Sequence, residues 1–150
     1  MSAARLFIAA VAIGAVAVRG ETCAEVVADT GAAIIPEGTL TIAAEAFLNC
    51  DALKSITVPA SVTALGNSAF QGSGLERFKL AGGSQIESLG EQTFADCAAL
   101  KKISIPKTVQ TLDGASFDNS GLDNLIFDVK SLQNDKNNLV FYKDRSVMYP

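Results

Sequence analysis

The chain has 150 residues, of which 49% are apolar and 19% charged, with 12 basic and 16 acidic side chains and a formal net charge of −4. This composition suits one domain with its own core and argues against disorder, which goes with few apolar residues and a high net charge. The acidic balance argues against nucleic acid as a partner. Because histidine is absent, the chain cannot hold a Ser-His-Asp triad, a Cys-His pair or a histidine metal site. An enzyme is therefore the weaker hypothesis.

Residues 1–20 are predicted to form a signal peptide. Arg5 precedes an apolar run from Leu6 to Val18, which has the length of a signal-peptide core and is shorter than the ~20 residues of a membrane span. Small residues before position 21 offer a cleavage site, and no second apolar run follows. We expect a secreted or cell-surface chain with no integral membrane span after cleavage and a net charge of −6, since its two arginines are lost.

One apolar pattern repeats four times between residues 35 and 127, with a period of 23 or 24. Each copy has a phenylalanine with an apolar residue five positions before it, then a turn, then Leu-x-x-apolar-x-apolar. The phenylalanines and leucines that begin these features are Phe47, Phe70, Phe94 and Phe117, and Leu53, Leu75, Leu100 and Leu122. The apolar-x-apolar segment is typical of a short strand with alternate residues inward, and no copy can bury its apolar set alone. A period of 20–29 is that of leucine-rich repeats, so we predict a β-rich solenoid of about four rungs with short parallel strands.

Turn-forming residues recur at fixed places in the pattern. Two positions after each phenylalanine come residues that tolerate left-handed backbone geometry or bond their own backbone. These are Asn49, Gly72, Asp96 and Asn119. Proline follows the last strand residue in three places, where a missing N–H ends strand pairing. Gly82-Gly83 take this place in the third repeat, with one extra residue.

The segment from Val58 to Phe70, Val-Pro-Ala-Ser-Val-Thr-Ala-Leu-Gly-Asn-Ser-Ala-Phe, resembles the BspA-like leucine-rich repeat family. That family has roughly the pattern Ile-Pro-x-x-Val-x-x-Ile-Gly-x-x-Ala-Phe-x-x-Cys-x-x-Leu-x-x-Ile-x-Ile. The departures are single positions: Ala43 and Asp113 replace the glycine, and Ser73 and Ser120 replace the cysteine. The resemblance implies a solenoid used for surface binding, often in adhesion, with no catalytic activity and no fixed ligand.

The flanking segments depart from the repeat. Residues 21–34 are expected to form an N-terminal cap over the open edge of the first rung, because solenoids need one. Its apolar residues include Val26, Val27, Ile34 and Ile35. Residues 128–150 begin with a polar linker and end in a segment that resembles the β-hairpin found in arrays of this family.

Two interpretations of the three cysteines stay open. Cys50 and Cys97 occupy one column two rungs apart, which separates their Cα atoms by roughly 9–10 Å, beyond the ~7 Å that a disulfide spans. Either the cysteines are small core residues, or Cys23 and Cys50 form a disulfide that holds the cap against the first rung. Without histidine or a Cys-x-x-Cys motif, no metal site is predicted, and no cofactor is expected.

The solvent-facing positions of the strands are unexpectedly basic for an acidic chain. Lysine and arginine hold five of twelve such positions and acidic residues hold two. The candidate binding residues are Lys54, Ser55, Thr57, Arg77, Lys79, Lys102, Ser104 and Asn124. Either the cations discourage pairing at sheet edges, or they form a face for a protein or acidic polymer. The rival functions are a structural subunit that packs into a larger assembly and an enzyme that uses carboxylates alone. The ligand and the oligomeric state are left open.

Overall fold

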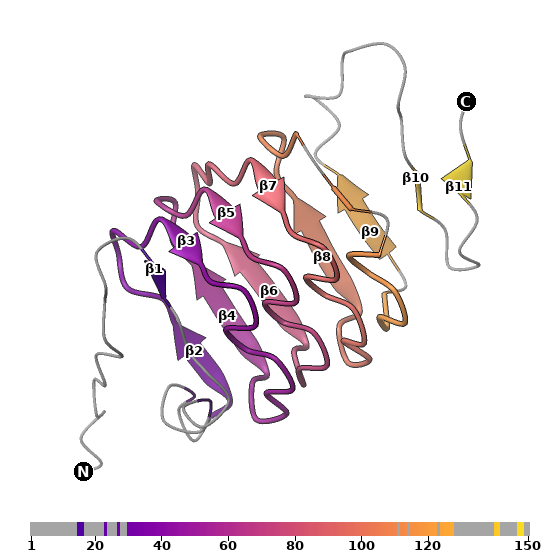
Figure 1. Ribbon diagram of the computed structural model, residues 1–150, viewed down its shortest axis with the longest axis horizontal. Coiled ribbons are helices and arrows are strands. Elements are labelled where there is room, and N and C mark those ends of the chain that lie inside the picture. The colour runs from indigo at the N-terminus through magenta and orange to yellow at the C-terminus, as the bar shows by residue number, and fades with distance from the viewer. Residues whose placement is uncertain are drawn as a thin grey trace.

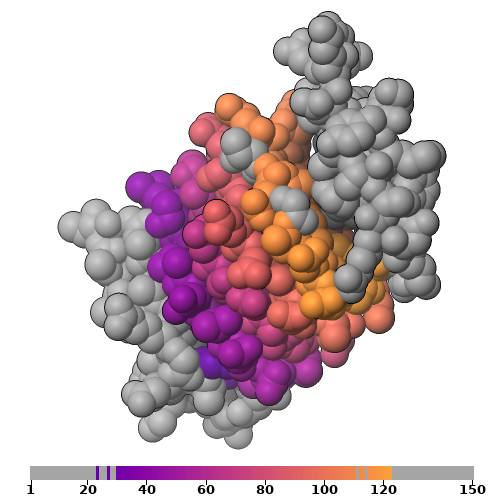
Figure 2. All heavy atoms as spheres, turned by 45° about the vertical axis from the view of Figure 1, so that its right-hand side comes forward, coloured from indigo at the N-terminus to yellow at the C-terminus, as the bar shows by residue number. Residues whose placement is uncertain are grey.

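The structure is a computed structural model in which the repeats stack as successive rungs (Figure 1). It describes residues 15–16, 23, 27, 30–110, 112–113, 115–122, 124–127, 140–141 and 147–148, of which 15–16, 124–127, 140–141 and 147–148 are described by their backbone alone. Seen as spheres, the rungs form consecutive bands that follow the chain from indigo to orange (Figure 2).

Each rung contributes a longer strand to one side of the coil and a two-residue strand to the other (Figure 1). The longer strands are β2 (Ala32–Ile34), β4 (Ser55–Val58), β6 (Arg77–Leu80), β8 (Lys102–Ile105) and β9 (Asn124–Phe127). The shorter strands are β1 (Ala15–Val16), β3 (Thr41–Ile42), β5 (Ala64–Leu65) and β7 (Ser88–Leu89). All pair in parallel, which confirms the predicted β-rich solenoid. The last two strands, β10 (Val140–Phe141) and β11 (Val147–Met148), pair antiparallel as the predicted hairpin.

The ladder of longer strands is interrupted once among the described strands. β2, β4 and β6 form one sheet and β8 and β9 form another, although β6 and β8 remain in contact. On the other side of the coil, β1, β3, β5 and β7 form an unbroken sheet. The solenoid is therefore continuous on its short-strand side and opened on its long-strand side between β6 and β8.

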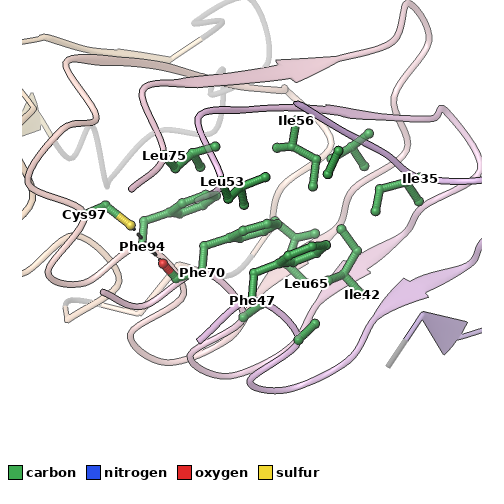
Figure 3. Packing of buried hydrophobic residues seen from close by; sticks show 14 of the residues in the cluster. Ile35, Ile42, Phe47, Leu53, Ile56, Leu65, Phe70, Leu75, Phe94 and Cys97 are labelled. Atoms are coloured by element: carbon green, nitrogen blue, oxygen red, sulfur yellow. Dashed lines mark hydrogen bonds between the residues drawn. The ribbon is translucent and has the colours of Figure 1, made fainter. Parts of the chain in front are cut away.

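The core is a column of stacked phenylalanines (Figure 3). The ring centroids of Phe47 and Phe70 lie 5.2 Å apart, those of Phe70 and Phe94 5.3 Å, and those of Phe94 and Phe117 5.5 Å, with interplanar angles of 2–6°. The first three rings are buried and Phe117 is half-buried. The leucine column behaves alike, because Leu53, Leu75 and Leu100 are fully buried while Leu122 is only partly so. Both predicted columns thus form the core.

The turns that carry the phenylalanines make a third set of contacts between rungs. The N–H groups of Glu45, Phe47 and Asn49 donate to carbonyls of the next rung, with N to O distances of 2.9, 2.7 and 2.8 Å. The intervening N–H groups of Ala46 and Leu48 donate three residues back within their own rung. Left-handed backbone makes this alternation possible, and the predicted column has φ of 53° to 65°. A second left-handed column, Glu45, Ser68 and Gln92, was not predicted.

The segment before the first full rung only partly matches the expected cap. Val27 and Ile35 are buried in the core, whereas Val26 lies outside the described residues. Ile34 does not cover the first rung as expected, because it is 82% exposed. It lies in β2, where strand alternation turns Ala33 inward and Ile34 to solvent.

The predicted signal peptide contains β1. This strand pairs with β3 at the edge of the short-strand sheet, so cleavage after residue 20 would leave β3 as the edge strand. Among the described residues, no helix is long and apolar enough to cross a membrane.

Candidate functional site

The long strands place the candidate binding residues on one face. In the register, Ser55 pairs with Arg77 and Thr57 with Lys79. The alternate residues Ile56 and Val58 are buried, so these four side chains point away from the core. Lys102 and Ser104 hold the corresponding exposed positions of β8. We call these six residues, Ser55, Thr57, Arg77, Lys79, Lys102 and Ser104, the strand face.

The remaining two candidates lie differently. Lys54 precedes β4 and is half-buried, and its backbone N–H donates to the Gly31 carbonyl with an N to O distance of 2.7 Å. It belongs to the turn that leads into the strand rather than to the exposed columns. Asn124 is paired with Lys102 through the backbone of β9, and its side chain lies outside the description.

The strand face is cationic, and its cations form no ion pair with a described carboxylate. Arg77, Lys79 and Lys102 are all exposed. None of the six residues of the face carries a negative charge. The face therefore keeps its positive potential for an external anion, on a chain whose net charge is negative.

A hollow opens where the long-strand ladder is interrupted. It is open to solvent and has a volume of about 500 Å³, at the carboxyl ends of β6 and β8. Its lining includes Phe78, Leu80, Ser84, Ser104 and Pro106, with Lys79 and Lys107 beside them. We call it the β6–β8 hollow. The hollow was not predicted from the sequence, although Gly82-Gly83 replace the proline of the other repeats at this place.

Two features of the third repeat produce the hollow. Six positions separate Leu80 from the next core residue, Ile86, against four between Val58 and Val62. The longer connection stands away from the body, since nothing lies within 4 Å of a Cβ added at Gly82. As a result Phe78 and Leu80 are half-buried, whereas Ile56 and Val58, their partners in β4, are 1% and 0% exposed.

One carboxylate of the phenylalanine turns, that of Asp96, has structural partners. Asp96 accepts hydrogen bonds from the Gln71 and Asn119 side-chain amides, with N to O distances of 3.3 and 3.1 Å. Asp96 and Asp118 are both exposed. No group of three metal-ligating side chains occurs in the part of the chain that the structure describes.

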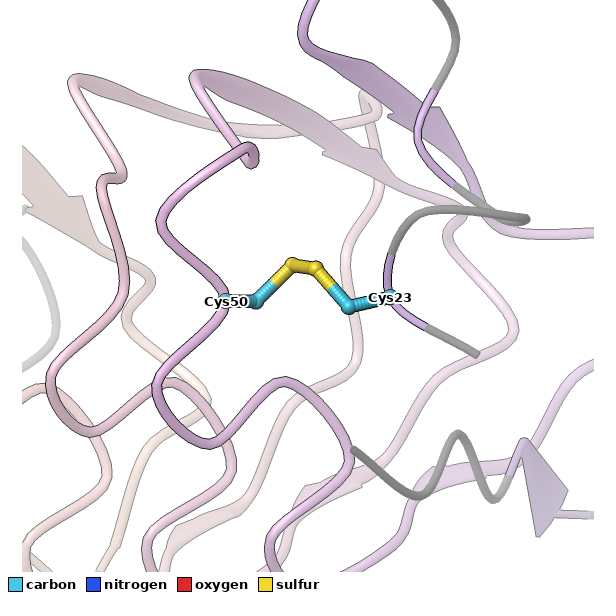
Figure 4. The surroundings of a disulfide bond; sticks show 2 residues. All are labelled: Cys23 and Cys50. Atoms are coloured by element: carbon cyan, nitrogen blue, oxygen red, sulfur yellow. A yellow bond between two sulfur atoms is a disulfide. The ribbon is translucent and has the colours of Figure 1, made fainter. Parts of the chain in front are cut away.

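The structure decides between the two interpretations of the cysteines. Cys23 and Cys50 form a disulfide with a Cα–Cα distance of 5.8 Å, which ties the N-terminal segment to the first rung (Figure 4). Cys97 is free and buried, and its thiol donates to the Phe70 carbonyl with an S to O distance of 3.0 Å (Figure 3). Burial raises the pKa of this thiol above its ordinary value of 9.0. Cys97 is thus an inert core residue.

A sequence model of the BspA type leucine-rich repeat region matches residues 29–146 in six copies. The chain belongs to the BspA-type leucine-rich repeat family. The six copies extend the repeat beyond both ends of the predicted segment 35–127. No curated protein is significantly similar in sequence.

Solved structures of bacterial leucine-rich repeat proteins share the fold. A leucine-rich repeat protein from Bacteroides capillosus is 32% identical, with a TM-score of 0.58, over 67% of this chain and 79% of its own. The pneumococcal vaccine antigen PcpA is 26% identical, with a TM-score of 0.61, over 73% of this chain and 28% of its own. A leucine-rich cell surface protein from Faecalibacterium prausnitzii is 28% identical, with a TM-score of 0.54, over 65% of this chain and 32% of its own. This chain therefore spans about a third or less of the length of the last two proteins.

Proposed function

We propose that this chain is an exported, non-catalytic adhesion module whose strand face binds an acidic partner, a protein or an acidic polymer. The observation that carries the proposal is the set of three exposed cations, Arg77, Lys79 and Lys102, on one face without a described counter-ion. Long-range attraction to such a face speeds encounter with an acidic partner and weakens with salt.

Three findings support export to the cell surface. The Cys23–Cys50 disulfide is typical of oxidising compartments outside the cytosol. The N-terminal sequence has the pattern of a signal peptide. One of the similar structures is described as a cell surface protein.

The cations have a competing explanation, which is protection of the strand edges. Arg77 and Lys79 lie on β6 and Lys102 on β8, so they flank the interrupted ladder, and cations at strand edges discourage pairing with a foreign strand. This explanation predicts that removal of the cations promotes self-association and does not weaken the binding of an acidic ligand. The two explanations therefore differ in a binding assay.

The test measures binding of the purified chain to immobilised poly-L-glutamate at 50 and 300 mM NaCl. The triple variant Arg77→Ala, Lys79→Ala, Lys102→Ala should bind at least tenfold more weakly at 50 mM and show a smaller salt dependence. The control lowers the net charge equally, by three, with Thr63→Glu, Gln92→Glu and Gln110→Glu. These positions tolerate glutamate, because other rungs carry Glu45 and Glu87 in the same columns.

Two outcomes would overturn the proposal. Equal weakening by the two triple variants would show that net charge, and not the strand face, governs binding. Unchanged binding by the alanine variant, together with self-association in analytical ultracentrifugation, would assign the cations to edge protection.

A further inference from the structure

The β6–β8 hollow combines apolar walls with cationic neighbours. Phe78, Leu80 and Pro106 provide the apolar surface, and Lys79 and Lys107 are exposed beside it. Phe78 is fixed in place, because its ring packs edge-on against Phe70 and Phe94 with centroid distances of 5.6 and 5.0 Å. The apolar wall is therefore part of the core and does not collapse into the hollow.

Size and charge restrict what the hollow can hold. A volume of about 500 Å³ falls in the range of small-ligand sites and accommodates one or two large side chains. Neither lysine has an ion-pair partner among the described residues. An apolar group carried between carboxylates matches both properties, since the apolar part leaves water while the carboxylates stay at the exposed ammonium groups.

Ser84 adds a polar group without a partner. Its Oγ is buried and forms no hydrogen bond to any described residue. A buried hydroxyl in this state is costly. Because Ser84 lines the hollow, an oxygen atom of a bound ligand is a suitable acceptor for it.

We propose that the β6–β8 hollow is the anchor site for an acidic peptide segment of the partner protein, which inserts one aromatic or large aliphatic side chain between Phe78, Leu80 and Pro106. Carboxylates on either side of that anchor bind Lys79 and Lys107. This inference rests on the proposed function and narrows it, because it selects a protein partner and a particular side chain.

The probes are two acetylated and amidated pentapeptides, Glu-Glu-Phe-Glu-Glu and Glu-Glu-Gly-Glu-Glu, titrated into the purified full chain by NMR. The phenylalanine peptide should bind about tenfold more tightly, since burial of an aromatic side chain supplies the difference. The chemical-shift changes that this peptide causes in the protein should centre on residues 78–84 and 104–107.

Blocking the hollow provides the second measurement. Ser104→Trp places a large side chain at the lining from an exposed strand position, so the fold should persist and the two peptides should bind alike. The control Thr63→Trp puts the same side chain beside β5 and should leave the preference for phenylalanine intact. Lys107→Ala should weaken the binding of both peptides several-fold, whereas Lys101→Ala should leave it unchanged.

The outcomes separate this inference from the proposed function. Equal affinity of the two peptides for the unmodified chain, or an unchanged preference in Ser104→Trp, would refute the anchor site while the strand face still binds poly-L-glutamate. Failure of poly-L-glutamate and of both peptides to bind would refute the proposed function itself.

Discussion

Replacing Phe70 by alanine should be among the most destabilising single changes in this solenoid. Phe70 is fully buried, stacks on Phe47 and Phe94 at 5.2 and 5.3 Å, and meets Phe78 edge-on. Removal of a buried aromatic side chain costs about 3–5 kcal/mol, and aromatic pairs add roughly 0.5–1.5 kcal/mol each. We therefore expect a loss near the top of that range, about 4–5 kcal/mol, because both neighbouring interfaces of an interior rung are weakened.

The matched control is Phe117→Ala at the next position but one in the same column. Phe117 is half-buried and has one described ring partner, Phe94 at 5.5 Å, so its replacement should cost about 2 kcal/mol. Urea unfolding followed by circular dichroism gives both free energies of unfolding, and thermal melts should drop by about 3 °C per kcal/mol. If Phe70→Ala does not fold, Phe70→Leu at about 1–2 kcal/mol keeps the comparison measurable. Equal losses at the two positions would refute the continuous stack.

Four further outcomes are expected. Gly66→Ala should destabilise the chain by about 1–3 kcal/mol, because the added Cβ meets the backbone of Ala43 and Ala44, whereas Gly82→Ala, with nothing within 4 Å, should be nearly neutral; urea midpoints compare them. Reduction of the Cys23–Cys50 bond, which closes a separation of 27 residues, should cost about 2–4 kcal/mol, seen as a lower melting temperature in dithiothreitol. Cys97 should resist alkylation by iodoacetamide at pH 8 until urea unfolds the chain. Because its pKa is raised in the folded chain, its contribution to stability should be lost as the pH rises above about 9, and the Cys97→Ala variant should not show this loss. Terminal sequencing of the exported protein should place its first residue between Val18 and Glu25, and an intact Met1 on intracellular protein would contradict export.

The periodic parts of the fold were predictable because every rung repeats the same solution. The phenylalanine column and the left-handed column at Asn49, Gly72, Asp96 and Asn119 follow from residue types suited to those roles. The second left-handed column, with Glu45, Ser68 and Gln92, gave no such signal, because these types do not favour positive φ. Bonds between rungs impose that geometry, and such bonds are visible only once the rungs are stacked.

The candidate site was predictable in part. Strand alternation alone placed Arg77, Lys79 and Lys102 on one exposed face. The interruption of the ladder beside them could not be predicted, because Gly82-Gly83 is equally compatible with a turn that keeps the ladder continuous. Whether two strands still pair after a longer connection depends on packing around Phe78, which no local pattern encodes.

The near-parallel rings of the core bear on how such chains change in length. Interplanar angles of 2–6° mean that each rung offers the next rung the same surface that it accepts from the one before. A duplicated or deleted unit of 23 or 24 residues therefore meets matching neighbours at both of its joints, and no core residue elsewhere must change. Evolution can lengthen or shorten such an array by recombination while the exposed strand positions diverge freely, and this fits similar bacterial proteins of which the present chain matches only 28% and 32%.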